Sequence, residues 1–211
     1  MKKLKAIIEK HIRAHIPIYF ISILIFTIGI VAGTYTVKAL PDPQKVELIQ
    51  YLKGFFQLLK NEDIDNYQLL FQSIFNNLKL FLPIWLIGLT LIGTPIILLI
   101  LGFRGFILGF TLGFLIDELS LKGVMFILLT IIPQNLFHIP GLIGIGVFAI
   151  SFSNFIFKNK IKKQPIHNLK SQIWTYTIIM LSIALLLVIG SLVEAYITPI
   201  FMKILSPNLI L

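Results

Sequence analysis

Three polar side chains, Gln134, Asn135 and His138, follow Pro133 inside a long apolar stretch of the sequence. Polar groups are costly in lipid, and they often mark a substrate or ion site there. A proline also frees backbone groups, which neighbouring polar side chains can satisfy by hydrogen bonding. Both interpretations of this candidate intramembrane polar site stay open, and we favour satisfaction of a broken helix.

Hydrolysis and nucleotide binding find little support in the sequence. The chain has no cysteine, and it contains no H-E-x-x-H, G-x-S-x-G or Walker A motif. A pair between His138 and Ser151 or Ser153 is conceivable, but no neighbouring residue supports it. We therefore expect a protein that is not an enzyme, with no catalytic residues, no cofactor and no metal.

The remaining charged candidates are expected where apolar spans end. Arg104, Asp117 and Glu194 would there reach headgroups or water. The pattern of loop charges puts Arg104 at the inner membrane face and the Asp117-Glu118 pair at the outer face.

Composition supports a membrane protein. The 211 residues are 57% hydrophobic and only 13% charged, whereas a soluble domain has about 25% charged residues. The net charge of +9 is explained by membrane topology: lysines gather in two segments, and segments rich in lysine are expected on the cytoplasmic side. Nucleic-acid binding is not expected, since no basic stripe with interleaved aromatics occurs.

Uncharged runs of about 20 residues, the length that spans a bilayer, divide the chain. We predict an all-α fold, a polytopic transmembrane helix bundle of about five spans plus an external amphipathic helical segment. The second span is predicted within Leu80 to Phe103, and a short third helix over Gly105 to Ile116. The predicted regions are a cytoplasmic basic N-terminus (1–15), a transmembrane helix (16–37), external amphipathic helices (38–79), a glycine-rich transmembrane core with a broken segment around 133–140 (80–157), a cytoplasmic basic loop (158–170), a transmembrane helix (171–197) and an external C-terminus (198–211).

The external segment contains an apolar face at helical spacing. Its members are Leu48, Leu52, Phe55, Phe56 and Leu59, and lysines, Glu47 and Gln57 lie between them. A second amphipathic helix, from Tyr67 to Leu78, is expected to run into the second span. An apolar face in water must be covered. It therefore lies on the membrane or the bundle, or it docks a partner protein.

Small residues recur at helical spacing in the core. Gly102, Gly105, Gly109 and Gly113 lie three and four residues apart, a pattern that allows two membrane helices to approach closely. We expect packing within the chain, with a homo-oligomer as the alternative.

Several segments together resemble one known family. They are Leu70 to Lys79, the G-F-x-x-G-F-x-x-G-F run (Gly102-Phe103-Arg104-Gly105-Phe106, then Gly109-Phe110 and Gly113-Phe114, with the pattern itself starting at Gly105), and Pro133-Gln134-Asn135 with Pro140. In this order they resemble stage II sporulation protein M, over about residues 10–163.

The resemblance implies a multi-pass membrane protein without catalytic activity. Such a protein is a scaffold that anchors peptidoglycan hydrolases, the stage II sporulation proteins P and D, at the sporulation septum. It is needed for septal thinning and for membrane migration during forespore engulfment. Its implied location is the cell membrane, on the mother-cell side of the septum and the engulfing membrane.

A second function remains open, because wider relatives resemble membrane subunits of transport systems that work with a separate ATPase. In this alternative, an ABC-type transport system, the segment from Pro133 to Pro140 lines a pathway. The cytoplasmic loop would then meet the ATPase.

Overall fold

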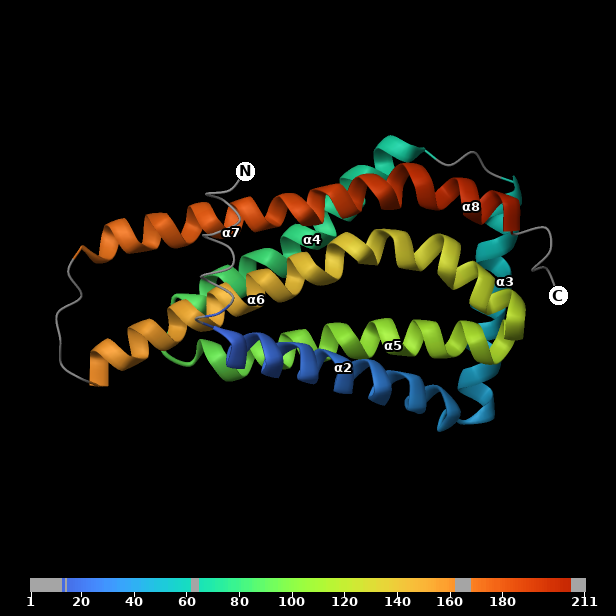
Figure 1. Ribbon diagram of the computed structural model, residues 1–211. Coiled ribbons are helices and arrows are strands. Elements are labelled where there is room, and N and C mark those ends of the chain that lie inside the picture. The colour runs from blue at the N-terminus through green and yellow to red at the C-terminus, as the bar shows by residue number, and fades with distance from the viewer. Residues whose placement is uncertain (1–12, 14, 62–64, 162–167, 206–211) are drawn as a thin grey trace.

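The computed structural model describes residues 13, 15–61, 65–161 and 168–205, and every regular element among them is a helix. Figure 1 shows long helices side by side, with one shorter helix lying across an end of the bundle. The elements are α2 (Ile16–Lys38), α3 (Asp42–Asn61), α4 (Asn66–Gly88), α5 (Gly93–Phe126), the π-helix η1 (Ile127–Ile131), α6 (Ile132–Ile161), α7 (Leu169–Leu192), the π-helix η2 (Val193–Ile197) and α8 (Thr198–Leu205).

The bundle has the architecture of a multi-pass membrane protein. Four continuous helical segments of the described chain are long and apolar enough to cross a membrane. One of them, Gly93–Ile161, folds back on itself as α5 and α6. The path through α2, α4, α5, α6 and α7 therefore passes along the bundle five times (Figure 1), which confirms the predicted all-α fold with about five spans.

The chain reverses inside α5, at Ser120, whose φ of 51° and ψ of −128° depart from the helix. Residues that follow the kink pack back on α5, and a side chain at Gly123 would overlap the Leu115 carbonyl. The absence of a Cβ at position 123 therefore permits the tight return.

The predicted second span was placed wrongly. Residues 89–92 form a turn inside the stretch from Leu80 to Phe103, so its first half completes α4 and its second half begins α5. The apolar run is continuous because both halves line the same bundle. Tyr67 to Leu78 consequently belongs to a helix of membrane-spanning length, and is not a separate external helix. The predicted short third helix is likewise part of the longer α5.

The predicted break around 133–140 is also absent. Helix α6 is continuous from Ile132 to Ile161, with Pro133 at its second position and Pro140 inside it. Proline is tolerated in a first turn, where its missing N–H has no partner to lose. The irregular backbone lies instead just before α6, in the π-helix η1.

Helices α2 and α5 are in backbone contact through the predicted glycine series. A Cβ at Gly105 or Gly109 would overlap the carbonyl groups of Phe26 or Ile30 on α2. From the other side, a Cβ at Gly33 would overlap the Phe106 carbonyl. Thr34 Oγ1 also donates to the Gly109 carbonyl at 3.0 Å. Small residues at this spacing thus form a seam within one chain.

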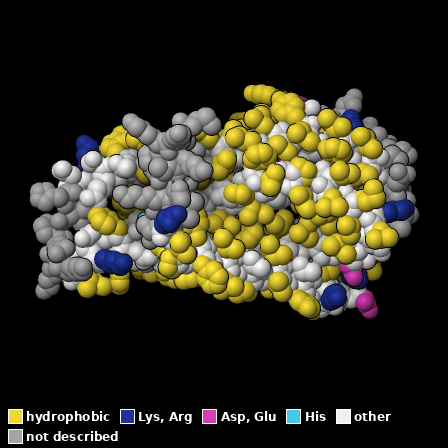
Figure 2. Space-filling view, in the orientation of Figure 1, with side chains coloured by type: hydrophobic (Ala, Val, Ile, Leu, Met, Phe, Trp, Pro, Cys, Tyr) yellow, Lys and Arg dark blue, Asp and Glu magenta, His cyan; other side chains and the backbone are white. Residues whose placement is uncertain are grey.

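The core and the surface are both apolar. Fully buried side chains at the centre come from four helices and are Ile84, Ile97, Leu101, Ile145, Ala149 and Met180. Figure 2 shows hydrophobic side chains spread over the long face of the molecule, whereas the charged side chains visible there lie largely towards its two ends. This arrangement suits a protein surrounded by lipid.

Helix α3 lies across one end of the bundle (Figure 1). Phe56 is its deepest residue, 2% exposed, and its ring packs edge-on against Phe126 at 5.6 Å. Lys45 Nζ forms ion pairs with Asp117 at 2.5 Å and with Glu118 at 3.5 Å. An apolar anchor and an ionic anchor therefore hold α3 against α5.

Candidate functional site

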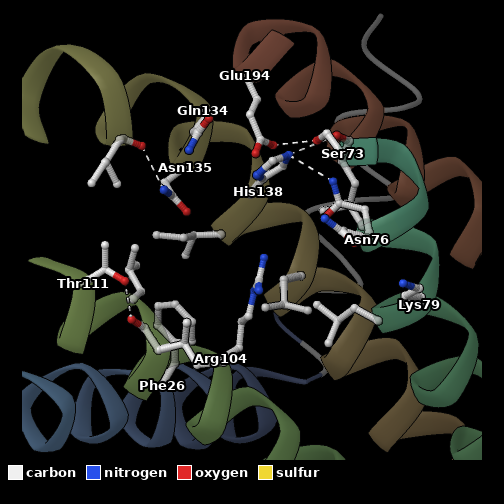
Figure 3. Close-up of a pocket in the computed structure, with 18 residues that line it drawn as sticks. Phe26, Ser73, Asn76, Lys79, Arg104, Thr111, Gln134, Asn135, His138 and Glu194 are labelled. Atoms are coloured by element: carbon white, nitrogen blue, oxygen red, sulfur yellow. Dashed lines mark hydrogen bonds between the residues drawn. The ribbon is translucent and has the colours of Figure 1, made fainter. Parts of the chain in front are cut away.

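A cavity of about 560 Å³ lies within the bundle and is lined by residues of α2, α4, α5, α6, α7, η1 and η2. Figure 3 shows its polar side chains converging from several helices. The five exposed lining residues all belong to α4 or α5; they are Asn76, Lys79, Arg104, Ile107 and Thr111. The cavity therefore opens between these two helices.

Hydrogen bonds connect the floor of the cavity. Asn77 Nδ2 donates to Ser191 Oγ at 2.9 Å and lies 3.3 Å from His138 Nε2. Ser191 Oγ donates to the Leu187 carbonyl at 3.1 Å. The role of His138 Nε2 depends on the tautomer of the ring: it accepts from Asn77 when the proton resides on Nδ1, and it can donate to a carbonyl when the proton resides on Nε2.

The imidazole of His138 fits the bundle because α7 has no side chain beside it. A Cβ at Gly190 would overlap the ring. The same nitrogen, Nε2, lies 3.2 Å from the Leu187 carbonyl one turn earlier on α7. Helix α7 thus fixes the ring from two positions.

Glu194 reaches the cavity from the π-helix η2. Its Oε2 accepts a hydrogen bond from Ser73 Oγ at 2.6 Å. The π-helix η1 is close by, because Thr198 Oγ1 donates to the Thr130 carbonyl at 3.2 Å. Single π-turns of this kind occur frequently at functional sites.

Arg104 lies on the opposite wall from Glu194 (Figure 3). Its prediction at the inner membrane face was wrong, because α5 begins at Gly93 and a rise of 1.5 Å per residue puts Arg104 about 16 Å from that end. Glu194 also lines this cavity, two residues after α7 ends at Leu192. In the described part of the chain, Arg104 forms neither a hydrogen bond nor an ion pair.

The three residues predicted as a polar site line this one cavity. Asn135 Nδ2 donates to the Ile131 carbonyl at 2.8 Å, and this hydrogen bond satisfies a backbone acceptor at the end of η1. Gln134 Oε1 lies 3.4 Å from Thr198 Oγ1 and can share its proton with the Thr130 carbonyl. His138 alone joins the network with α4, so the group divides into one amide that bonds to backbone, one amide that faces a threonine side chain, and one ring on the cavity floor.

Sequence reasoning missed the contribution of α4. Ser73 and Asn77 are buried and lie four residues apart on one face of an otherwise apolar helix. Ser191 and Glu194 have the matching three-residue spacing on the facing segment. This pairing of small polar residues in two apolar helices was a usable signal, because such residues form interhelical hydrogen bonds in membranes.

The predicted docking residues of α3 face mostly inward. Phe56 is buried, and Leu52 packs on the same cluster with Leu115 and Leu119. Leu48 is half-buried, and Phe55 is 37% exposed. The side chain of Leu59 lies outside the described part of the structure. The exposed side of α3 presents Tyr51 instead, at 80% exposure.

The cavity can bind a polar or charged group, because it offers a cation, a carboxylate, an imidazole and several amides. Among the described residues, no three His, Asp or Glu side chains are grouped as a metal site would require. Its volume falls within the range of about 300–1,000 Å³ that is usual for ligand sites.

One comparison with known proteins gives a match. The model of the family described as stage II sporulation protein M matches residues 22–199. No curated protein and no solved structure matches the chain.

Proposed function

We propose a function from the premise that the chain belongs to the stage II sporulation protein M family. Membership makes it a sporulation-related membrane protein, and its apolar helices make it multi-pass. We infer that it is a non-catalytic scaffold which holds peptidoglycan hydrolases, the stage II sporulation proteins P and D, at the septal membrane. It acts on the mother-cell side during engulfment.

The observation that carries this proposal is the attachment of α3. The helix is pinned across the end of the bundle by Phe56 and Lys45, while Tyr51 points away from the bundle and is 80% exposed. A helix fixed on one side and open on the other is a rigid platform for a partner protein. Exposed tyrosine is a common anchor in such interfaces.

The charges support an extracytoplasmic position for α3. Lys158, Lys160 and Lys170 lie at the other end of the bundle, where α6 ends and α7 begins. An excess of basic residues marks the cytoplasmic end of a membrane protein. In the sequence, segments 1–15 and 158–170 together hold ten basic residues and one acidic residue, whereas basic residues at the α3 end, such as Lys45, are accompanied by acidic ones. The acidic residues Asp117 and Glu118 lie beside α3, as the outer end requires in this orientation.

The test is co-purification of the two hydrolases with the tagged chain from sporulating cells. Tyr51→Ala is expected to reduce recovery by about tenfold, as loss of an interface anchor does. Tyr35→Ala is the matched control, because Tyr35 is 67% exposed on α2 but lies in a membrane-spanning helix. Unchanged recovery with Tyr51→Ala would reject docking through α3.

The polar cavity favours a second candidate, the membrane subunit of an ABC-type transport system. Charged groups at membrane depth are typical of transport pathways. In that case His138→Ala changes transport and Tyr51→Ala does not. The same purification would then recover an ATPase instead of hydrolases.

A further inference from the structure

The cavity presents opposite charges on facing walls. Arg104 enters from α5 and Glu194 from η2, and both line the same space (Figure 3). No ion pair joins them in the part of the chain that the structure describes. An uncompensated cation at this depth is costly unless an anion or water meets it.

The mouth of the cavity faces the lipid side of the bundle. Arg104 and Ile107 are exposed at its rim on α5, and their neighbour Phe103 is 66% exposed. Lys79 stands on the α4 side of the rim, with its Nζ 4.5 Å from the centre of the Phe75 ring. A ligand entering between α4 and α5 therefore meets cations first and the carboxylate of Glu194 last.

The Glu194 carboxylate can accept a further hydrogen bond. Its Oε2 accepts from Ser73, and in the part of the chain that the structure describes Oε1 has no hydrogen-bond partner. A carboxylate oxygen can accept further hydrogen bonds from an ammonium group. The guanidinium of Arg104 presents a fork that matches two phosphate oxygens.

We propose that this cavity binds the headgroup of a phosphate–ammonium zwitterionic lipid of the phosphatidylethanolamine type. Arg104 contacts the phosphate, with Lys79 at the rim, and Glu194 accepts from the primary ammonium. The acyl chains leave between α4 and α5 along the apolar surface. A choline headgroup has no N–H to donate, and a glycerol headgroup can donate only from neutral hydroxyl groups, so neither offers Glu194 a hydrogen bond from a cation.

The experiment uses the purified full-length chain in detergent with three lipids of identical acyl chains, which carry ethanolamine, choline or glycerol headgroups. Native mass spectrometry measures the lipid that stays bound. We expect ethanolamine lipid to be retained about tenfold more than either of the others, the effect of one charged hydrogen bond. Equal retention of the three lipids would overturn the proposal without any variant.

Two variants locate the headgroup. Glu194→Gln is expected to remove the preference for ethanolamine over glycerol, whereas Glu47→Gln, an exposed carboxylate on α3, leaves it. Arg104→Gln is expected to lower retention of all three lipids, whereas Lys53→Gln on α3 does not. If the Arg104 and Glu194 variants are folded and retain lipid as the unchanged chain does, the assignment is wrong.

A soluble competitor separates a lipid from a free zwitterion. Glycerophosphoethanolamine carries the same headgroup without acyl chains. At about a thousandfold excess it is expected to leave the lipid bound, because it lacks the apolar contacts. Displacement of the lipid would overturn the lipid assignment in favour of a water-soluble ligand.

Discussion

The ring of His138 lies against Gly190, so close that a methyl group at position 190 would overlap it. The contact joins α6 to α7 at the floor of the polar cavity. It makes the position of the imidazole depend on the absence of a side chain on the neighbouring helix.

Replacing Gly190 with alanine should therefore displace the ring. We expect Gly190→Ala to lower the free energy of unfolding by about 1–3 kcal/mol, as overpacking does. His138→Ala in the same chain removes the overlapping ring, so the double variant should be more stable than the sum of the two single changes predicts. Thermal unfolding of all four proteins in one detergent measures this coupling. Additive effects would show that the two positions do not meet.

The seam between α2 and α5 should tolerate no side chain. Gly109→Ala forces a methyl group onto the Ile30 carbonyl, and we expect a loss of about 1–3 kcal/mol or more, because backbone cannot move aside easily. Gly54→Ala on α3 is the control, since nothing lies within 4 Å of its added Cβ. That change should stabilise its helix by about 0.5–1 kcal/mol. Equal melting temperatures for the two variants would contradict the seam.

The apolar anchor of α3 can be tested with neighbouring phenylalanines. Phe56→Ala should cost about 3–5 kcal/mol of docking free energy, because the ring is buried against Phe126. Phe55→Ala should cost much less, since Phe55 is partly exposed. A spin label at Lys53→Cys reports α3 mobility, and the chain has no other cysteine. A label equally immobile in both variants would argue against this anchor.

The ionic anchor should respond to alkaline pH. The hydrogen bond to Asp117 raises the pKa of Lys45 above its ordinary value of 10.5. Because the pKa is raised on folding, the ion pair contributes its full stabilisation below pH 10.5. That stabilisation is lost as the pH rises through the higher pKa that Lys45 has in the folded protein. The spin label at position 53 should therefore become more mobile as the pH rises above 10.5 and through the raised pKa of Lys45. Lys45→Gln should show no such transition; if the transition persists in that variant, another group is responsible.

Much of the bundle could be predicted from apolar length alone. The uncharged run from Ile16 corresponds to α2, and the run from Ser171 corresponds to α7. The turn at 89–92 was missed because no charge marks it. Both of its flanks are buried in the same apolar core, where Ile84 and Ile97 are fully enclosed. Hydropathy indicates whether a segment is surrounded by lipid and protein or by water, but it does not show where the chain reverses direction.

The site was predictable only in part. Gln134, Asn135 and His138 stood out because they follow a proline in an apolar run. Arg104 was misplaced because its depth depends on where α5 begins, which the missed turn determines. The partners of His138 come from two helices, with Asn77 61 residues away and Leu187 49 residues away, and only the folded bundle brings them together.

The seam between α2 and α5 has a consequence for biosynthesis. Thr34 and its acceptor Gly109 are 75 residues apart, and a ribosome needs about 4–15 s to cover that distance. During this interval α2 resides in the bilayer with its glycine face unmatched. The protein therefore completes its strongest helix pair only after two intervening helices have been made, and a chaperone or insertase that shields such faces would serve this nascent chain directly.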